Sequence, residues 1–168
     1  MKISIIAAIG NNHELGLNNK LPWFVPRDML NFMLTTLNHH ILMGRNTYLS
    51  LGRPLPNRTN MILSHDPNLK IKDCYIFDEF ENAYNFALER DEPEFFIIGG
   101  SSIYELAIPV SDRMYLSRVD YSGTADTFFP QFNLADWNLV EERHHPTIIT
   151  KSAIIPSWNF QILDRIKK

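Results

Sequence analysis

A single carboxylate near the start of the chain stands where it could serve chemistry. Residues 21–28 read LPWFVPRD, and Asp28 falls in the first turn of a helix predicted to begin near Pro26. Phe32 lies four residues further on and projects from the same face. A carboxylate at the rim of an apolar pocket can accept two parallel hydrogen bonds from a cationic heterocycle. Burial would raise the pKa of such a group and the helix terminus would lower it, while an ordinary solvated aspartate is the alternative.

Two turns that contain glycine could bind phosphate groups. FFIIGGSSIYE (95–105) reads as a strand, a Gly-Gly turn and the start of a helix, and ILMGRNTY (41–48) repeats this scheme. Ligands of open α/β sheets bind beyond the carboxyl ends of the strands, and glycine lets a phosphate approach backbone N–H groups. The two turns therefore predict a nucleotide, and Arg45 suits the phosphate monoester that separates NADP from NAD. A tight turn without a ligand is the alternative for each.

The distribution of charge also indicates an anionic small molecule. The formal net charge is −3, yet the stretch between Asp28 and Asp66 has no acidic residue and contains three histidines with Arg45, Arg53 and Arg58. Clustered positive charge raises the local concentration of anions. Nucleic acid is disfavoured because the arginines are not interleaved with stacking aromatic residues and the overall charge is negative. A solvated face with a chance gap in acidic residues is the alternative.

Other chemistry-bearing residue types lack the spacing of a metal or nucleophile site. His39–His40 and His144–His145 are adjacent pairs, which do not place two ligands on one helical face, so no metal is expected. The single cysteine, Cys74, excludes an intramolecular disulfide and a cysteine-based zinc site, and it favours a reducing compartment, which we take to be the cytoplasm. No serine stands in a nucleophile-elbow pattern, and no apolar stretch approaches the ~18 residues of a membrane helix.

The predicted elements would bring these residues together in one α/β domain of residues 1–168. Continuous apolar runs are typical of strands covered on both faces of a sheet, and they predict strands at 3–10, 40–44, 60–64, 74–77, 94–100 and 113–119. The first of these runs favours a buried strand over a signal peptide. Helical spacing, with Pro26 suited to a first helical position, predicts helices at 26–37, 46–51, 80–90 and from Ser101 or Ser102 onward.

After residue 113 the predicted strands follow one another without helices. Segments 138–145 and 157–166 read as an antiparallel hairpin that closes the sheet. The expected fold is a mostly parallel central sheet of about eight strands with an antiparallel C-terminal edge hairpin, flanked by about four helices. A chain of 168 residues, 45% of them apolar, can bury such a core without disulfides.

In their order along the chain, these segments resemble dihydrofolate reductase of the bacterial type. The resemblance covers essentially the whole chain and is carried by ISIIAAIG, ELGLNNKLPW, PRDMLNF, ILMGRNTYLSLGRPLPNR, FIIGGSSIYE, ADTFFP and FQILDR. It implies NADPH-dependent reduction of 7,8-dihydrofolate to 5,6,7,8-tetrahydrofolate, in which the cofactor carries the hydride. It also implies a monomer whose partners are dihydrofolate and antifolate inhibitors such as trimethoprim, with no nucleic acid and no membrane.

The resemblance assigns roles in the folate site. Asp28 would bind the pterin 2-amino group and N3 and support protonation at N5 through water. Leu21 and Trp23 would complete the catalytic set from the mobile loop that closes over the nicotinamide. Arg58 would hold the α-carboxylate of the glutamate moiety, for which a bidentate guanidinium fits. The expected substrate contacts are Ile6, Asp28, Phe32, Leu51, Leu55, Arg58, Ile98, Tyr104 and Ser117.

The resemblance also assigns the NADPH site. Thr47 and residues 99–102 would cradle the pyrophosphate. Arg45, Ser64 and His65 would read the 2′-phosphate, although His65 could equally be a plain loop histidine. The expected cofactor contacts are Ala8, Leu15, Gly16, Asn19, Lys20, Gly44, Arg45, Asn46, Thr47, Leu63, Ser64, His65, Gly99, Gly100, Ser101, Ser102, Ile103 and Tyr104.

Two departures from the family pattern concern the mobile loop. Ala125 stands where many members carry glycine, in the segment that supports the closed loop, and Ile155 stands near where a serine can stabilise an open, occluded state. Because isoleucine cannot donate that hydrogen bond, the loop is expected to stay closed, or closed and disordered, across ligand states.

Two other functions are compatible with parts of this pattern. A reductase of riboflavin synthesis shares the fold, but it would act on a ribosylamino-pyrimidine phosphate and would not need Asp28 together with Arg58. Intact Asp28, Trp23 and the Gly-Gly turn argue against a catalytically silent pterin-binding protein. An absorbance assay with NADPH and dihydrofolate separates all three.

Overall fold

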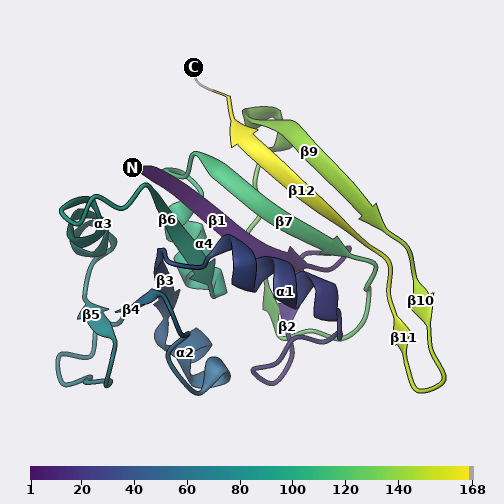
Figure 1. The fold of residues 1–168 in the computed structure, drawn as a ribbon, viewed down its shortest axis with the longest axis horizontal. Coiled ribbons are helices and arrows are strands. Elements are labelled where there is room, and N and C mark those ends of the chain that lie inside the picture. Colours follow the sequence, from purple (N-terminus) through teal and green to yellow (C-terminus); the bar gives the residue numbers. More distant parts are fainter. Residues whose placement is uncertain (167–168) are drawn as a thin grey trace.

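The computed structural model describes residues 1–166, and in it the apolar runs of the sequence and the two C-terminal hairpin segments form one eight-stranded sheet (Figure 1). Its strands, in spatial order, are β5 (Tyr75–Phe77), β4 (Thr59–Leu63), β3 (His40–Gly44), β6 (Glu94–Gly99), β1 (Lys2–Ile9), β7 (Arg113–Val119), β12 (Trp158–Arg165) and β9 (Trp137–His145). Every neighbouring pair from β5 to β7 is parallel, and β12 is antiparallel to both β7 and β9. The predicted parallel sheet with an antiparallel C-terminal edge is confirmed.

Four helices of the described residues accompany this sheet: α1 (Pro26–Thr35), α2 (Arg45–Leu51), α3 (Phe80–Leu88) and α4 (Ser101–Ala107). Helix α1 starts at Pro26 as predicted. Proline has no backbone N–H, and this costs nothing in the first turn, where N–H groups have no partner within the helix. Helices α1 and α3 end two residues earlier than predicted. Asn38 and Asp91 lie just beyond them with φ of 63° and 55°, in the left-handed region that a right-handed helix does not use.

Short elements of residues 1–166 lie outside the predicted pattern. Strand β2 (Glu14–Gly16) pairs with β8 (Thr127–Phe128), β10 (Ile148–Ile149) pairs with β11 (Ile154–Ile155), and the 3-10 turn η1 (Leu134–Asp136) precedes β9. Segments this short show no period in the sequence. In Figure 1, β10 and β11 form a hairpin that projects from the sheet beyond β9 and β12.

Both faces of the sheet are buried along the central strands β4, β3, β6, β1 and β7, which explains their continuous apolar runs, whereas edge strand β9 is mostly exposed. Ile5 and Ile6, adjacent in β1, belong to two different apolar clusters, because successive strand residues point to opposite faces. Ala83 of α3 and Ala107 of α4 join the cluster of Ile5, whereas Phe32 of α1 packs against the cluster of Ile6. Helices α3 and α4 therefore cover one face, and α1 covers the other.

A buried carboxylate fixes the beginning of β3 beside the beginning of β6. Glu92 accepts hydrogen bonds from the Nδ1 atoms of His39 and His40 at 2.6 and 2.5 Å, and from the backbone N–H groups of His40 and Glu94 at 2.9 and 3.0 Å. Burial raises the pKa of Glu92, but these hydrogen bonds outweigh it and hold the pKa below its ordinary value. The adjacent histidine pair thus has a structural role, away from the carboxyl ends of the strands.

A second polar network joins four strands at the same edge. Ser4 Oγ and the Tyr115 hydroxyl donate to Glu94 Oε1 at 2.5 and 3.0 Å, which links β1 and β7 to β6. Arg113 donates two hydrogen bonds to Asp164 of β12, at 2.5 and 2.8 Å. The Arg113 guanidinium lowers the pKa of Asp164. Together with Glu92, this network keeps the strand order fixed at the edge opposite the predicted ligand sites.

Replacing Glu92 by glutamine tests the structural role of this edge. We expect Glu92→Gln to lower the free energy of unfolding at pH 7 by about 1–3 kcal/mol, because buried donors lose their charged acceptor. Since the folded pKa is depressed, this contribution is present above the unfolded pKa and disappears as the pH falls through the folded pKa. Urea unfolding of both proteins at falling pH should therefore show a shrinking difference. Glu89→Gln, at an exposed position, is the control, and an equal effect of both variants would contradict the role.

Candidate active site

Asp28 lies buried where α1 approaches β7. Its Oδ1 accepts a hydrogen bond from Ser117 Oγ of β7, although 89 residues separate the two along the chain. Burial raises the pKa of Asp28, and the hydrogen bond from Ser117 opposes that rise. The solvated alternative is therefore wrong. Burial prevails, and Ser117 supplies the opposing contribution that the sequence analysis attributed to the helix terminus.

Tyr104 of α4 joins this region through β1. Its hydroxyl donates to the Ile6 carbonyl at 2.9 Å, and both residues are buried. Burial raises the pKa of Tyr104, and the nearby Asp28 charge raises it further. The phenol is therefore neutral near pH 7 and serves as a donor. Four predicted substrate contacts from four different elements, Ile6, Asp28, Tyr104 and Ser117, are thereby brought together.

The other predicted apolar contacts fall into two groups. Ile98 is buried in the same cluster as Ile6, and Phe32 and Leu55 pack against that cluster. Leu51, at the end of α2, is instead 38% exposed. The structure therefore gathers most of the predicted pocket lining on one face of the sheet and leaves Leu51 at the surface.

The two predicted loop residues differ in their surroundings. Trp23 is buried and packs edge-on against Tyr121, with ring centroids 5.4 Å apart. Its Nε1–H is also buried, and it has no hydrogen-bond partner within residues 1–166. Buried polar groups are normally paired, so this donor can serve a ligand or a bound water. Leu21 is 49% exposed.

Arg58 is held beside the C-terminal end of α1. Its Nε donates to Thr36 Oγ1 at 2.9 Å, its Nη1 to the Pro56 carbonyl at 2.5 Å, and its Nη2 to the Met33 carbonyl. These contacts fix the orientation of the guanidinium. Its role toward a ligand carboxylate stays a prediction.

The two glycine turns lie side by side. A Cβ atom at Gly100 would lie 3.4 Å from Thr47 Oγ1, and one at Gly44 would lie 3.1 Å from Ile103 Cγ1. Gly99 has a φ of 113°, and its Cβ would lie 3.1 Å from the Tyr104 ring. Glycine is thus required at Gly99 by backbone conformation as well as by space. The sequence predicted that both turns follow carboxyl ends of strands, and the pairing of β3 with β6 brings the turns together.

Predicted cofactor contacts follow the carboxyl ends of the parallel strands or lie in the loop beside them. The carboxyl ends of β1, β3, β4 and β6 carry Ala8, Gly44, Leu63 and Gly99, and the residues that directly follow β4 and β6 are Ser64, His65 and Gly100. The first residues of α2 are Arg45, Asn46 and Thr47, and those of α4 are Ser101, Ser102, Ile103 and Tyr104. Strand β2 contains Leu15 and Gly16, and the loop after it contains Asn19 and Lys20.

The turn after β4 contains an acidic residue that the sequence analysis did not assign to the site. Asp66 Oδ2 lies 3.8 Å from Arg45 Nη1. The Asp66 backbone N–H donates to Ser64 Oγ at 3.2 Å. Arg45, Ser64 and Asp66 thus form one corner, with the exposed His65 between the last two in sequence. The position of Asp66, two residues after the predicted contact Ser64, was the signal by which the sequence could have assigned Asp66 to this site.

The loop after β2 is held by contacts at both of its sides. Asn18 N–H donates to Asp126 Oδ2 at 2.8 Å, and Asp126 N–H donates to the Gly16 carbonyl at 2.9 Å. Across from them, Ser50 Oγ of α2 donates to the Asn19 carbonyl at 2.5 Å. Asp126, next to the unusual Ala125, is another residue that sequence reasoning missed. That the loop keeps this arrangement across ligand states stays a prediction.

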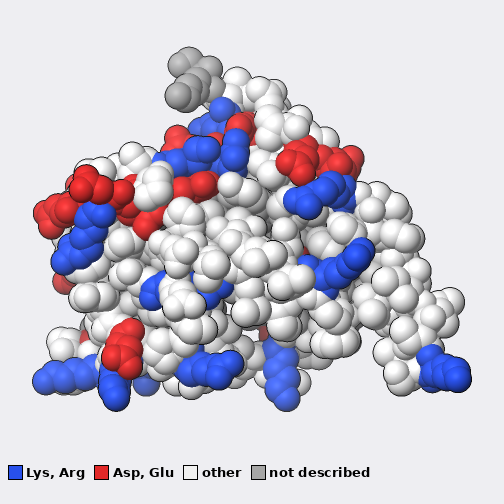
Figure 2. Space-filling model, viewed as in Figure 1, with Lys and Arg blue, Asp and Glu red and all other residues white. Residues whose placement is uncertain are grey.

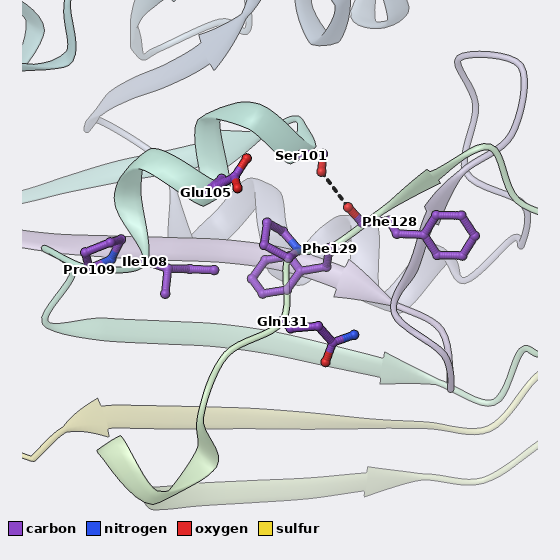
Figure 3. Close-up of a pocket in the computed structure, with 8 residues that line it drawn as sticks. Ser101, Glu105, Ile108, Pro109, Phe128, Phe129 and Gln131 are labelled. Atoms are coloured by element: carbon purple, nitrogen blue, oxygen red, sulfur yellow. Dashed lines mark hydrogen bonds between the residues drawn. The ribbon is translucent and has the colours of Figure 1, made fainter.

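A separate groove of about 600 Å³ lies along α4 and the segment after β8 (Figure 3). Ser101 Oγ donates to the Phe128 carbonyl at 2.7 Å, which joins two of the elements that line it. Of the predicted site residues, only Ser101 contributes to its lining. The lining residues are Ser101, Glu105, Ile108, Pro109, Phe128, Phe129, Pro130 and Gln131.

Charge on the molecular surface is unevenly distributed. Figure 2 shows Lys and Arg side chains along the edge that carries α2, whereas acidic side chains gather over α3. Among residues 1–166, no three His, Cys, Asp or Glu side chains are grouped so as to hold a metal ion. No helix in that part of the chain is long and apolar enough to cross a membrane.

The model of the dihydrofolate reductase family matches residues 2–155. The chain belongs to the dihydrofolate reductase family. The family member described as dihydrofolate reductase type 3 from Salmonella typhimurium is 38% identical over 146 residues, which cover 87% of this chain and 89% of the relative. Dihydrofolate reductase of Staphylococcus haemolyticus is 39% identical over 140 residues, 83% of each chain.

A solved structure of the family shares the whole fold. Dihydrofolate reductase from Enterococcus faecalis, complexed with NADP(H) and RAB-propyl, superposes with a TM-score of 0.89 at 26% identity, covering 99% of this chain and 97% of that one. The family resemblance and the fold predicted from the sequence are confirmed. The roles of the individual site residues stay predictions.

Removing the Ser117 hydroxyl tests the electrostatic balance at Asp28. We expect Ser117→Ala to raise the pKa of Asp28 further, because the hydrogen bond that stabilises the carboxylate is lost while burial remains. The pKa can be followed by carbon NMR of the Asp28 carboxyl group in both proteins. Ser152→Ala, at an exposed position, is the control. An unchanged Asp28 pKa in Ser117→Ala would contradict this account.

Proposed function

We propose that this chain is an oxidoreductase that reduces 7,8-dihydrofolate to 5,6,7,8-tetrahydrofolate with NADPH. Membership of the dihydrofolate reductase family supports this reaction. The observation that carries it is the buried Asp28 carboxyl, hydrogen-bonded to Ser117 and set beside the apolar cluster of Ile6 and Ile98. The riboflavin-pathway reductase and the silent pterin-binding protein are not favoured, since the family match names neither.

Asp28 would hold the pterin and support its protonation. A carboxylate can accept parallel hydrogen bonds from the 2-amino group and N3. Because its pKa is raised, Asp28 exchanges protons closer to neutral pH than an ordinary aspartate does. Proton delivery to N5 would pass through a water, and the unpaired Trp23 Nε1–H is suited to donate to that water.

The carboxyl ends of the strands fit NADPH, which supplies the hydride when it is bound. Gly100 has no side chain to cover its backbone N–H, and Thr47 lies next to it, so a pyrophosphate would reach both residues. Arg45 and Ser64 would face the 2′-phosphate, for which a guanidinium is a strong partner. The loop held by Asp126 would shield the reacting atoms from water.

The remaining assignments complete the proposal. Arg58, oriented by its contacts to α1, would bind the glutamate α-carboxylate of the substrate. Antifolate inhibitors, trimethoprim among them, would bind the same pocket. We further propose that residues 1–168 act as one domain and as a monomer, and that the protein works in the cytoplasm, as its single cysteine favours.

The assay that tests this function follows NADPH oxidation by absorbance in the presence of dihydrofolate. Asp28→Asn preserves shape but removes the charge, so the turnover number near neutral pH should fall by at least ~100-fold. Part of the loss should return at low pH, where the substrate is already protonated. Asp91→Asn, at an exposed position, should leave turnover unchanged. No NADPH oxidation by the wild-type protein would overturn the function, and wild-type turnover of Asp28→Asn at pH 7 would overturn the role of Asp28.

Cofactor choice provides a second test. Arg45→Ala should raise KM for NADPH by roughly 10- to 150-fold, the equivalent of losing a charge-assisted contact of ~1.5–3 kcal/mol. KM for NADH should change little, because NADH lacks the 2′-phosphate. Arg53→Ala, an exposed arginine just beyond α2, is the control. Equal losses for both cofactors would mean that Arg45 has a structural role instead.

A further inference from the structure

Asp66 faces the guanidinium that the proposed function assigns to the 2′-phosphate. Strands β3 and β4 pair in parallel with Gly44 opposite Leu63, so Arg45 and Ser64, the next residues, leave the sheet at the same edge. Asp66 lies at the same edge, and its Oδ2 is 3.8 Å from Arg45 Nη1. A carboxylate therefore stands where the proposed function requires a binding site for a dianion.

Local hydrogen bonds hold the Asp66 side chain in this position. Its Oδ1 accepts the Asn68 N–H at 3.0 Å, and its own N–H donates to Ser64 Oγ at 3.2 Å. Pro67 lies between Asp66 and Asn68 in the sequence and restricts the backbone of the turn. One carboxylate oxygen is thus engaged in the turn, and the other is directed toward Arg45. The pairing with Arg45 follows from the fold of the turn itself.

A carboxylate at this position has two effects on a bound phosphate monoester. It competes with the phosphate for Arg45, and it repels the phosphate charge directly. Both effects act on NADPH, whereas NADH carries no phosphate at this corner. The side chains of Arg45 and Asp66 are 53% and 40% exposed, so solvent screens both effects and keeps them moderate.

We propose that Asp66 is a specificity-determining residue that weakens NADPH binding and narrows the preference for NADPH over NADH. This inference rests on the proposed function, because it requires the 2′-phosphate to bind beside Arg45. In the free protein Asp66 pairs with Arg45. In the NADPH complex Asp66 opposes the phosphate, and release of the oxidised cofactor is faster as a result.

The opposite role is distinguishable by sign. If Asp66 instead orients Arg45 for the phosphate, removing its charge weakens NADPH binding. Asp66→Asn is suited to this comparison, because the asparagine carbonyl oxygen can still accept the Asn68 N–H and preserve the turn. Asp73→Asn makes the same change of net charge in the same segment between β4 and β5, at an exposed position, and is the matched control.

The experiment measures dissociation constants of NADPH and NADH for the full chain, by quenching of tryptophan fluorescence, without any folate. Asp66→Asn should bind NADPH about threefold to tenfold more tightly, with NADH changed by less than about twofold. The gain should disappear in the Arg45→Ala background, since a double-mutant cycle isolates the coupling of the two residues. It should also shrink at high ionic strength.

Each other outcome overturns either the role of Asp66 or the NADPH site. Weaker or unchanged NADPH binding by Asp66→Asn, an equal gain in Asp73→Asn, or a gain that persists with Arg45→Ala would overturn the role of Asp66. The proposed function would survive such a result as long as the wild-type protein binds NADPH and oxidises it with dihydrofolate. Failure of the wild-type protein to bind NADPH would overturn the NADPH site and the inference about Asp66 together.

Discussion

Parallel pairing of the strands is the constraint on which the rest of the structure depends. It sends β1, β3, β4 and β6 toward one edge of the sheet, where the segments that follow must begin. The turns at Gly44 and Gly99, distant in sequence, meet there for this reason, and ligands of open α/β sheets bind at such edges. The direction of the strands therefore determines where the candidate site lies, and the individual side chains determine what it can bind.

The opposite edge carries the polar contacts that hold the sheet in order. Glu92 receives donors from two histidines and two backbone N–H groups, and Arg113 forms a paired contact with Asp164 across β7 and β12. The carboxylates of Glu92 and Asp164 are satisfied within the protein. One buried ring nitrogen at each edge has no partner within residues 1–166, namely His40 Nε2 in the Glu92 cluster and Trp23 Nε1 at the predicted ligand site. The contacts that fix the strand order thus lie at the edge opposite the predicted ligand site.

Solvent exposure decides what an aspartate does in this protein. Asp28 is buried beside apolar side chains, so its pKa is raised and its protonation state can change during a reaction. The side chain of Asp66 is 40% exposed, so solvent screens its interaction with Arg45. The proposed roles of the two aspartates, proton transfer for Asp28 and cofactor selectivity for Asp66, follow this difference in exposure.

Local sequence patterns were sufficient to predict the main helices and strands, but only the tertiary structure decided which distant side chains pair. Apolar runs predicted six strands of the main sheet, and the two C-terminal hairpin segments predicted the other two, all to within one residue at each end. Pro26 predicted the start of α1, because proline acts over a few residues. The short strands β2 and β8, with no period of their own, form only because packing brings them together. The contacts of Asp28 with Ser117 and of Asn18 with Asp126 join residues that are far apart in the chain. Such contacts depend on sheet register and on burial, which no local segment specifies, and so the sequence determined which residues could react while the fold determined which of them meet.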